Sequence, residues 1–486
     1  MHLEYITTRS SMESRYSVAV AAYALISLLY ILVQGYDSTL TFYISLVLPT
    51  IFIVFLMLFG FKDDLGVVQL YILFLCSQNL LLGLGTIVSS SYDYNQLSKL
   101  LLYKEVLSVI IFGGLALRFI LSNNGKVALR SIDFIVMGIL GVIIVSFFRS
   151  NAPIFNRIAY LRNFSFVFIY FYIGRMLRLG GNEAKRLMDW LFLLAVGVVV
   201  FGFVEVTFIS SEMWFNGLFD LKRVYIAKTL SRYEHLLRNG VPLMWFSKLG
   251  GVFYRRMVSI YMEPVNLSYF LSVPLLWSFI TEKHKFLSTL LLFGACCTLG
   301  KGGLLIFFLS LGLIMYVSYS NENNFNKLLL KCFVILLAVV LLSFNFIKDS
   351  ALPHFIGLLS IPSNLVEHPV GNGLGVGGNF ARISGLVSSR AEWLKSGGES
   401  ATGTIAYQLG VPGLLLYIFF FYGISNRMFI SAVKKESSKG LMGVGLSVAI
   451  FTVMLFQENA MSPHASSIIF IVIGFIYEKS LCIGET

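Results

Sequence analysis

Stretches of roughly twenty mostly apolar residues recur along this chain, and they restrict its fold more than any other feature. A helix needs about 20 such residues to cross the hydrocarbon core of a bilayer. Within that core every backbone N–H and C=O must be bonded inside the protein, so helices are one of only two structures that can span it. The sequence therefore predicts an all-α integral membrane protein, built as a polytopic helical bundle.

The composition excludes an ordinary water-soluble protein. Of 486 residues, 57% are hydrophobic and 13% are charged, whereas about 25% of a soluble domain is charged. The five cysteines lie in apolar stretches or the C-terminal tail, without a C-x-x-C pair, so neither a disulfide framework nor a zinc site is expected. The first apolar run begins near Ser17 without a small-x-small cleavage site, which favours a membrane helix over a removed signal peptide.

The apolar pattern predicts about fourteen transmembrane helices in a single transmembrane domain that covers residues 1–486. The boundaries of such helices are the least certain part of the prediction. The predicted spans are 17–35, 41–61, 67–90, 105–123, 131–148, 158–177, 188–210, 263–281, 286–300, 302–319, 328–347, 404–423, 440–457 and 466–478.

The distribution of Lys and Arg predicts the orientation. Alternate short segments carry eighteen of these residues, and the opposite short segments carry five. Cytoplasmic loops carry the excess of positive charge. Both termini are therefore expected in the cytoplasm, and two large loops, 211–262 and 348–403, are expected outside.

The first large outer loop is basic. Residues 211–257 have a net charge of +5, and such a surface attracts anions; ordinary lipid headgroups are the alternative to a specific ligand. Apolar residues recur between the basic ones at roughly helical spacing, which predicts a helix along the outer interface. These residues are Leu221, Val224, Leu230, Tyr233 and Leu237.

Arg255 and Arg256 are candidates for binding a phosphate or diphosphate. Adjacent guanidinium groups at a membrane surface can form bidentate hydrogen bonds with phosphate oxygens; snorkelling to lipid phosphate is the alternative. Glu263 and Pro264 open the next predicted helix. Glu263 is a candidate catalytic carboxylate, or an acid that stabilises the positive end of its helix.

Two further arginines could add positive charge to the same outward site. Arg162 lies inside a predicted span, and a charge there usually faces a cavity or a partner. If the boundary is wrong by a turn, Arg162 is interfacial instead. Arg157 lies on the short outer turn before it.

The second large outer loop is rich in glycine, with HPVGNGLGVGG at 368–378. Glycines such as Gly373 and Gly375 let a backbone turn tightly or approach another group closely. The run lacks the G-K-[ST] ending of a phosphate loop, so no nucleotide is expected. His354 and His368 lack a clear third ligand, so no metal site is expected.

Glu399 closes the second loop, directly before a predicted helix. A carboxylate there can act as a general base if its surroundings raise its pKa; an N-terminal capping acid is the alternative. Gly410 and Gly413 lie one turn apart in the helix that follows, which predicts a close approach by a neighbouring helix.

Three segments resemble the O-antigen polymerase and ligase superfamily (the Wzy and WaaL types). They are RRMVSIYMEPVNLSYFL, TLGKGGLLIFFLSLG, and HPVGNGLGVGG followed by ESATGTIAYQLGVPGLLLYIFFF, and together they cover roughly residues 250–425. In the ligases the last motif reads His, Asn/Ser/Gln, nine residues, G-x-x-G. Ser400, Gly410 and Gly413 match it, whereas Glu399 stands at the His position, which favours the polymerase type.

The resemblance implies a metal-independent, GT-C-like glycosyltransferase of the bacterial inner membrane, without a cofactor or a nucleic-acid partner. It would transfer a glycan from undecaprenyl diphosphate to a lipid-linked repeat unit on the outer face. Glu399, Arg256 and Glu263 would be catalytic, and Arg255, Arg256, Arg162 and Arg157 would bind the diphosphate. Whether a chain-length regulator protein binds is left open.

Two alternatives remain at this point. A ligase would join the glycan to a different acceptor. A flippase or other transporter belongs to another class, which usually shows internal repeats and helices broken near the bilayer midplane. No matched halves are evident in this sequence.

Overall fold

The computed structural model describes most of the chain from Asp64 to Leu481. The described residues are 64–88, 103–122, 129–218, 221–222, 225, 237–238, 240–249, 252–282, 284–320, 323–332, 334 and 354–481.

Eight helices within these ranges are long and apolar enough to cross a membrane. They are α3 (Asp64–Val88), α5 (Tyr103–Ser122), α6 (Ser131–Arg149), α8 (Gly181–Phe208), α10 (Pro264–Thr281), α12 (Lys301–Ser320), α17 (Ala401–Lys434) and α19 (Pro463–Leu481). Two shorter apolar helices are α11 (Lys285–Cys297) and α18 (Ser438–Met454). The charged helix α7 (Ile154–Met176) has 23 residues.

These helices confirm the prediction of a helical, multi-pass membrane protein at the level of its elements. Eleven of the predicted spans coincide with these helices, although α8 begins earlier, at Gly181, and α17 continues to Lys434. The predicted spans 17–35 and 41–61, and most of 328–347, lie outside the described residues, as does most of the predicted interfacial helix. The count of fourteen and the GT-C-like arrangement stay predictions.

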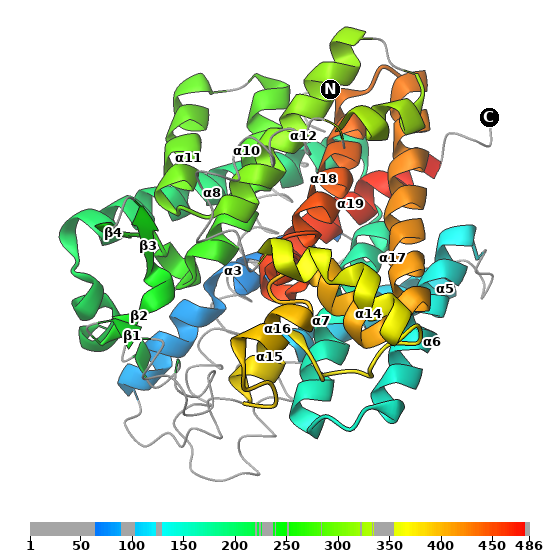
Figure 1. Cartoon of the computed structure of the whole chain (residues 1–486). Coiled ribbons are helices and arrows are strands. Elements are labelled where there is room, and N and C mark those ends of the chain that lie inside the picture. Colours follow the sequence, from blue (N-terminus) through cyan, green and yellow to red (C-terminus); the bar gives the residue numbers. More distant parts are fainter. Residues whose placement is uncertain are drawn as a thin grey trace, which may run out of the picture. The chain divides into compact units, whose positions relative to one another are not determined.

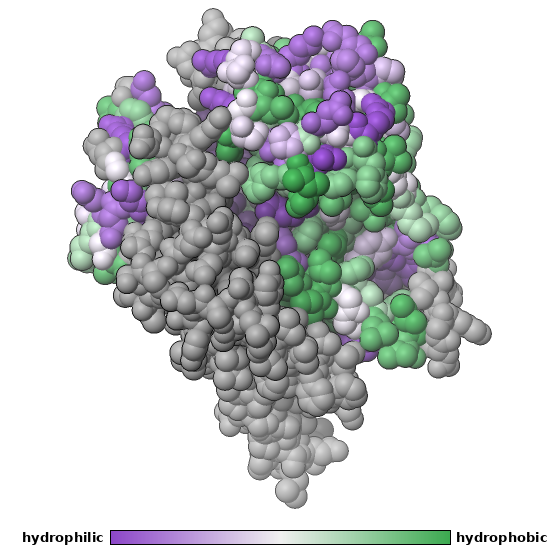
Figure 2. Space-filling model, turned by 90° about the horizontal axis from the view of Figure 1, so that it is seen from below, coloured by the Kyte–Doolittle hydropathy of each residue, from purple (hydrophilic) through white to green (hydrophobic). Residues whose placement is uncertain are grey.

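Many large apolar side chains lie on the surface of these helices. Phe134 on α6, Phe208 on α8, Phe286 on α11 and Tyr319 on α12 are all more than half exposed. Figure 2 shows such apolar surface beside hydrophilic areas on one face of the molecule. Exposed apolar side chains of this size are expected where helices face lipid rather than water.

The chain divides into two compact units. The first comprises Met1–Gly125, Met176–Leu267 and Thr289–Leu299. In it, α3 packs against α5, α8 and the short helix η5 (Ser259–Tyr261). Two antiparallel hairpins, β1 (Leu237–Arg238) with β2 (Val241–Pro242) and β3 (Phe246–Leu249) with β4 (Val252–Arg255), belong to the first large loop (Figure 1).

The second unit comprises Lys126–Arg175, Ser268–Ser288 and Gly300–Thr486. Helix α17 packs against α6, α18 and α19, and α12 packs against α18. Helices α7 and α19 cross at reciprocal glycines, because a Cβ at Gly174 would overlap the carbonyl oxygen of Ile471 and a Cβ at Gly474 would overlap that of Phe171. Short helices α14 (Ile361–Glu367), α15 (Gly378–Ile383) and α16 (Arg390–Lys395) gather at one end of α17 (Figure 1).

Helix α17 is broken at Gly410, whose φ of 68° and ψ of −160° are not helical. This region of backbone conformation is essentially restricted to glycine. The backbone N–H and C=O groups that lose their helical partners at the break form hydrogen bonds with the glycine-rich loop. The N–H of Val411 donates to Pro369 O (2.8 Å), and the N–H of Gly373 donates to Gln408 O (3.1 Å).

Candidate functional site

Arg255 lies at the end of β4 and is held by a buried carboxylate. Its guanidinium forms an ion pair with Glu205 of α8, a side chain with no exposed surface, and donates to the carbonyl of Ile209. Glu205 also accepts from the backbone N–H groups of Val258 (3.2 Å) and Ser259 (3.1 Å). Because a buried charge needs a partner, this pair fixes the loop to α8.

Arg256 is bonded to carbonyl groups at the end of α11. Its guanidinium donates to Thr298 O (2.7 Å), Met244 O (3.0 Å) and Leu299 O (3.4 Å). Burial lowers the pKa of Arg256 to about 10, which leaves the side chain charged at neutral pH. A cation suits the negative end of a helix, so the structure accounts for Arg256 without a ligand.

Glu263 directly precedes α10. Its carbonyl accepts from the N–H of Leu267 (3.1 Å), and its carboxylate accepts from the side-chain amide of Asn266. This position agrees with the helix-end alternative that the sequence left open.

A second set of polar side chains lies in the other unit and centres on Glu458. This residue opens a short helix, η6 (Glu458–Met461), between α18 and α19. Its carboxyl accepts from the Tyr160 hydroxyl (2.6 Å) and from the backbone N–H of Asn379 (3.0 Å). The pKa of Glu458 is raised to about 7, chiefly by burial and also by the nearby negative charge of Glu399, although the hydrogen bonds from Tyr160 and Asn379 oppose the shift.

Glu399 lies in the same unit and is paired with His354. His354 Nε2 is 3.2 Å from a carboxylate oxygen of Glu399, and its Nδ1 contacts the carbonyl of Phe456. Both partners of the imidazole, the Glu399 carboxylate and the Phe456 carbonyl, can accept a hydrogen bond from it. The Glu399 side chain is 40% exposed and can therefore meet a ligand.

Ser400, rather than Glu399, caps α17. Its hydroxyl accepts from the N–H of Gly403 at 2.9 Å. Glu399 precedes this cap by one residue and has its carboxylate on His354. The capping alternative for Glu399 therefore loses its structural support.

Arg162 lies close to the Glu458 set. Its guanidinium is 5.8 Å from the ring centre of Phe380, and the same ring packs edge-on against Tyr160 at 5.6 Å. Arg157 lies over the ring of Phe147 (5.3 Å) and donates to the Phe147 carbonyl at 3.4 Å. A cation–π contact does not neutralise the positive charge of an arginine.

The glycines of the second loop and of α17 serve close backbone packing. A Cβ at Gly410 would overlap Pro369 O, so a loop, rather than a second helix, makes the close approach there. Gly373 packs on Ser150, and Gly375 packs on the backbone of α7. A Cβ at Gly413 would meet the Leu409 side chain of its own helix.

The predicted site residues thus fall into two groups. Arg255, Arg256 and Glu263 belong to the first unit, whereas Arg157, Arg162, Glu399 and the four glycines belong to the second. The residues that sequence reasoning missed are Glu205, Tyr160 and Glu458. Glu205 and Glu458 had a usable signal, because each is an acid inside or at the end of an apolar span, where an ionisable group is a functional candidate by default.

In the part of the chain that the structure describes, no group of three or more His, Cys, Asp or Glu side chains could hold a metal ion. Neither a protein-family model nor a curated protein matches this chain.

Proposed function

We propose that this protein is a polysaccharide polymerase that transfers a glycan from undecaprenyl diphosphate to a lipid-linked repeat unit on the outer face of the bacterial inner membrane. The observation that carries the proposal is the set of Glu399, His354 and Glu458 at one end of the second unit, with Arg162 nearby. Such a transfer needs a carboxylate that can take up a proton and a cation that can stabilise the leaving diphosphate, and the buried carboxyl of Glu458 fixes the residues around them.

The reaction joins two substrates and releases the lipid carrier. A hydroxyl oxygen of the incoming repeat unit attacks the anomeric carbon of the growing glycan. The bond from that carbon to the diphosphate oxygen breaks, and the lipid diphosphate leaves with the bonding electron pair. The hydroxyl proton passes to a general base, and a cation stabilises the charge on the leaving group.

In this proposal Glu399 is the base. Its contact with His354 fixes the carboxylate at the end of α17. Glu458 is a positioning residue: it fixes Tyr160 and the N-terminus of α15 through its two hydrogen bonds.

Arg162 is the first candidate for the diphosphate, with Arg157 as a second cation on the same helix. Arg255 is a weaker candidate, because the Glu205 carboxylate offsets its charge. Arg256 is held by three carbonyl groups but has no carboxylate partner among the described residues, so its charge remains available to a ligand.

The break in α17 does not favour the transporter alternative. Broken helices in transporters leave carbonyl groups that coordinate ions. Here the carbonyls of Tyr407 and Gln408 accept hydrogen bonds from the N–H groups of Asn372 (2.9 Å) and Gly373 (3.1 Å). The loop thus occupies the position at which an ion would bind.

The test is purified protein supplied with synthetic lipid-diphosphate repeat units, with the products counted by length. Glu399→Gln should reduce polymerisation by about 100-fold or more, because general-base catalysis contributes about 10² to 10⁴. Glu399→His should retain part of the activity, because imidazole can also accept the proton. Glu392→Gln is the matched control, since Glu392 is an exposed acid in α16 of the same loop.

Polymerisation at the wild-type rate by Glu399→Gln would remove the base from the mechanism. Deletion of the gene separates the function classes. Single repeats on the surface glycan would support a polymerase, ladders left on their carrier would indicate a ligase, and missing lipid-linked units outside would indicate a flippase.

A further inference from the structure

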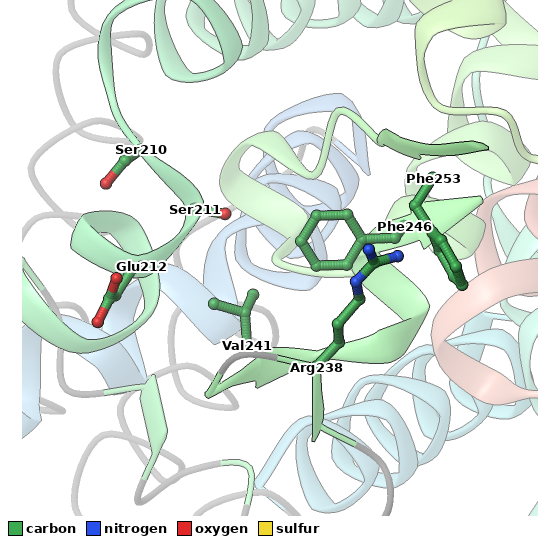
Figure 3. A pocket seen from close by; sticks show the side chains of 7 residues that line it. All are labelled: Ser210, Ser211, Glu212, Arg238, Val241, Phe246 and Phe253. Carbon is green, nitrogen blue, oxygen red and sulfur yellow. The ribbon is translucent and has the colours of Figure 1, made fainter. Parts of the chain in front are cut away.

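A cavity of about 310 Å³ lies in the first large loop, and none of the residues assigned above is among its lining residues. Its lining comes from three places in the chain. The end of α8 contributes Ser210, Ser211 and Glu212, the first hairpin contributes Arg238 and Val241, and the second hairpin contributes Phe246 and Phe253 (Figure 3). All of these residues belong to the first unit.

The two charged side chains of the cavity are not paired with each other. Figure 3 shows the hydroxyl and carboxylate groups of Ser210 and Glu212 on one side and the guanidinium of Arg238 on the other. Among the described residues neither charge forms an ion pair, and Arg238 Nη1 is buried without a hydrogen-bond partner. A charged group without a partner favours a ligand that can form hydrogen bonds with it.

The local fold holds this arrangement open. Arg238 is fixed by the ring of Phe253, whose centre is 3.5 Å from the guanidinium carbon, and by the ring of Phe246 at 5.7 Å. Beneath the cavity a buried cluster anchors both walls, with Trp214 next to Glu212 and Trp245 next to Phe246. Trp245 is in turn bonded through its indole N–H to Met262 O at 3.1 Å.

The chemistry of the lining selects among ligand classes. A phosphate would gain from Arg238 but would meet the carboxylate of Glu212 within the same cavity. A purely apolar ligand would leave both charges without partners. A ring that carries several hydroxyl groups satisfies the lining, because each hydroxyl can accept from Arg238, donate to Glu212, or do both with the serines, while the C–H faces contact Val241 and Phe246.

We propose that this cavity is a saccharide subsite, which binds one sugar ring of a glycan through Arg238 and Glu212. The inference rests on the proposed function in one respect: the glycan would be the chain that the protein extends. In that setting the binding energy of the subsite serves to position the substrate.

The test measures binding rather than turnover. The full-length protein in nanodiscs is titrated calorimetrically with three probes: a phosphate-free oligosaccharide released from the host's own surface glycan, the same oligosaccharide with a phosphate at its reducing end, and inorganic phosphate. Arg238→Ala and Glu212→Gln should each weaken binding of the first two probes by about tenfold or more. Arg390→Ala, an exposed arginine of α16, is the control and should bind as the wild type does.

Glu212→Gln is the decisive variant. A saccharide subsite predicts weaker binding, whereas an anion site predicts stronger binding of inorganic phosphate once the carboxylate is gone. The inference would be overturned if both variants bound the oligosaccharides as tightly as the wild type does. It would also be overturned if inorganic phosphate were the only probe that competed for the cavity. Because this assay measures binding without catalysis, its result is independent of the polymerisation assay. The subsite proposal can fail while the polymerase proposal stands, and the reverse also holds.

Discussion

Glu458 is a buried carboxyl group that accepts hydrogen bonds from Tyr160 and Asn379. The Tyr160 hydroxyl and the Asn379 N–H stabilise its charged form, yet burial outweighs them and its pKa rises to about 7. Between about pH 4.5 and pH 7 the folded protein therefore binds a proton at this residue that the unfolded chain releases. The free energy of unfolding must then decrease as the pH rises through that window.

This linkage gives a pH prediction. The contribution of Glu458 is fully present below about pH 4.5 and is lost above about pH 7, and a shift of this size corresponds to about 3 kcal/mol. In Glu458→Gln the fall in apparent melting temperature between pH 4.5 and pH 7.5 should be smaller than in the wild type. The control is Glu392→Gln, whose pH profile should follow the wild type. Parallel profiles of Glu458→Gln and wild type would show that Glu458 titrates normally.

At the scale of elements, the break of α17 decides how the second loop is held. Near Gly410, backbone N–H and C=O groups of the loop form hydrogen bonds with α17, and these replace the bonds that a continuous helical turn would make. Sequence reasoning identified both the glycine-rich loop and Gly410, but it assigned Gly410 to contact with a helix. The pairing joins residues roughly forty positions apart, and no local periodicity indicates which distant backbone occupies a given gap.

Gly410→Ala should be strongly destabilising. Alanine at this φ and ψ is strained, and its Cβ would overlap the Pro369 carbonyl. We expect a lower melting temperature that reflects at least about 2 kcal/mol, together with faster proteolysis within 368–378. Gly423→Ala is the matched control, because Gly423 is in the same helix and a Cβ there meets only Ile132 at 3.6 Å. Equal stability of the two variants would contradict the role given to the break.

At the scale of the molecule, contacts within the second unit join segments that the charge pattern assigned to the same side of the membrane. Arg130, Arg175 and Glu478 meet in one ion-pair cluster, and all three lie at ends predicted to be cytoplasmic. Arg149 contacts Gly371, and Glu458 contacts Asn379, which joins segments predicted to be outside. The grouping agrees with the alternation of sides, while the compartment that each end faces remains a prediction.

Reporter tags test that orientation. Tags at the N-terminus, after Lys435 and at the C-terminus should report the cytoplasm, and tags near Gly240 and Gly397 should report the outside. The reason is the excess of Lys and Arg on one set of short segments. A cytoplasmic signal from the tag near Gly397 would contradict both the orientation and the assignment of Glu399 to an outer site.

The helices could be predicted because lipid imposes a length and an apolar composition on each one separately. Only part of the candidate site could be predicted from the sequence. Glu399 and Arg162 could be found as charges at or within apolar spans. Their surroundings could not, because Tyr160, His354, Asn379 and Glu458 come from four separate segments, and only the packed helices bring those segments together.

The crossing of α7 and α19 also sets an order for biosynthesis. At the crossing point a glycine of each helix lies against a carbonyl group of the other, yet roughly 300 residues separate the two helices in the chain. At a synthesis rate of about 5–20 residues per second, α7 exists for about 15–60 s before α19 is made. During that interval the surface around Gly174 is open to lipid or to other helices. A ribosome that stalls late would therefore leave a chain in which α7 lacks its contact with α19.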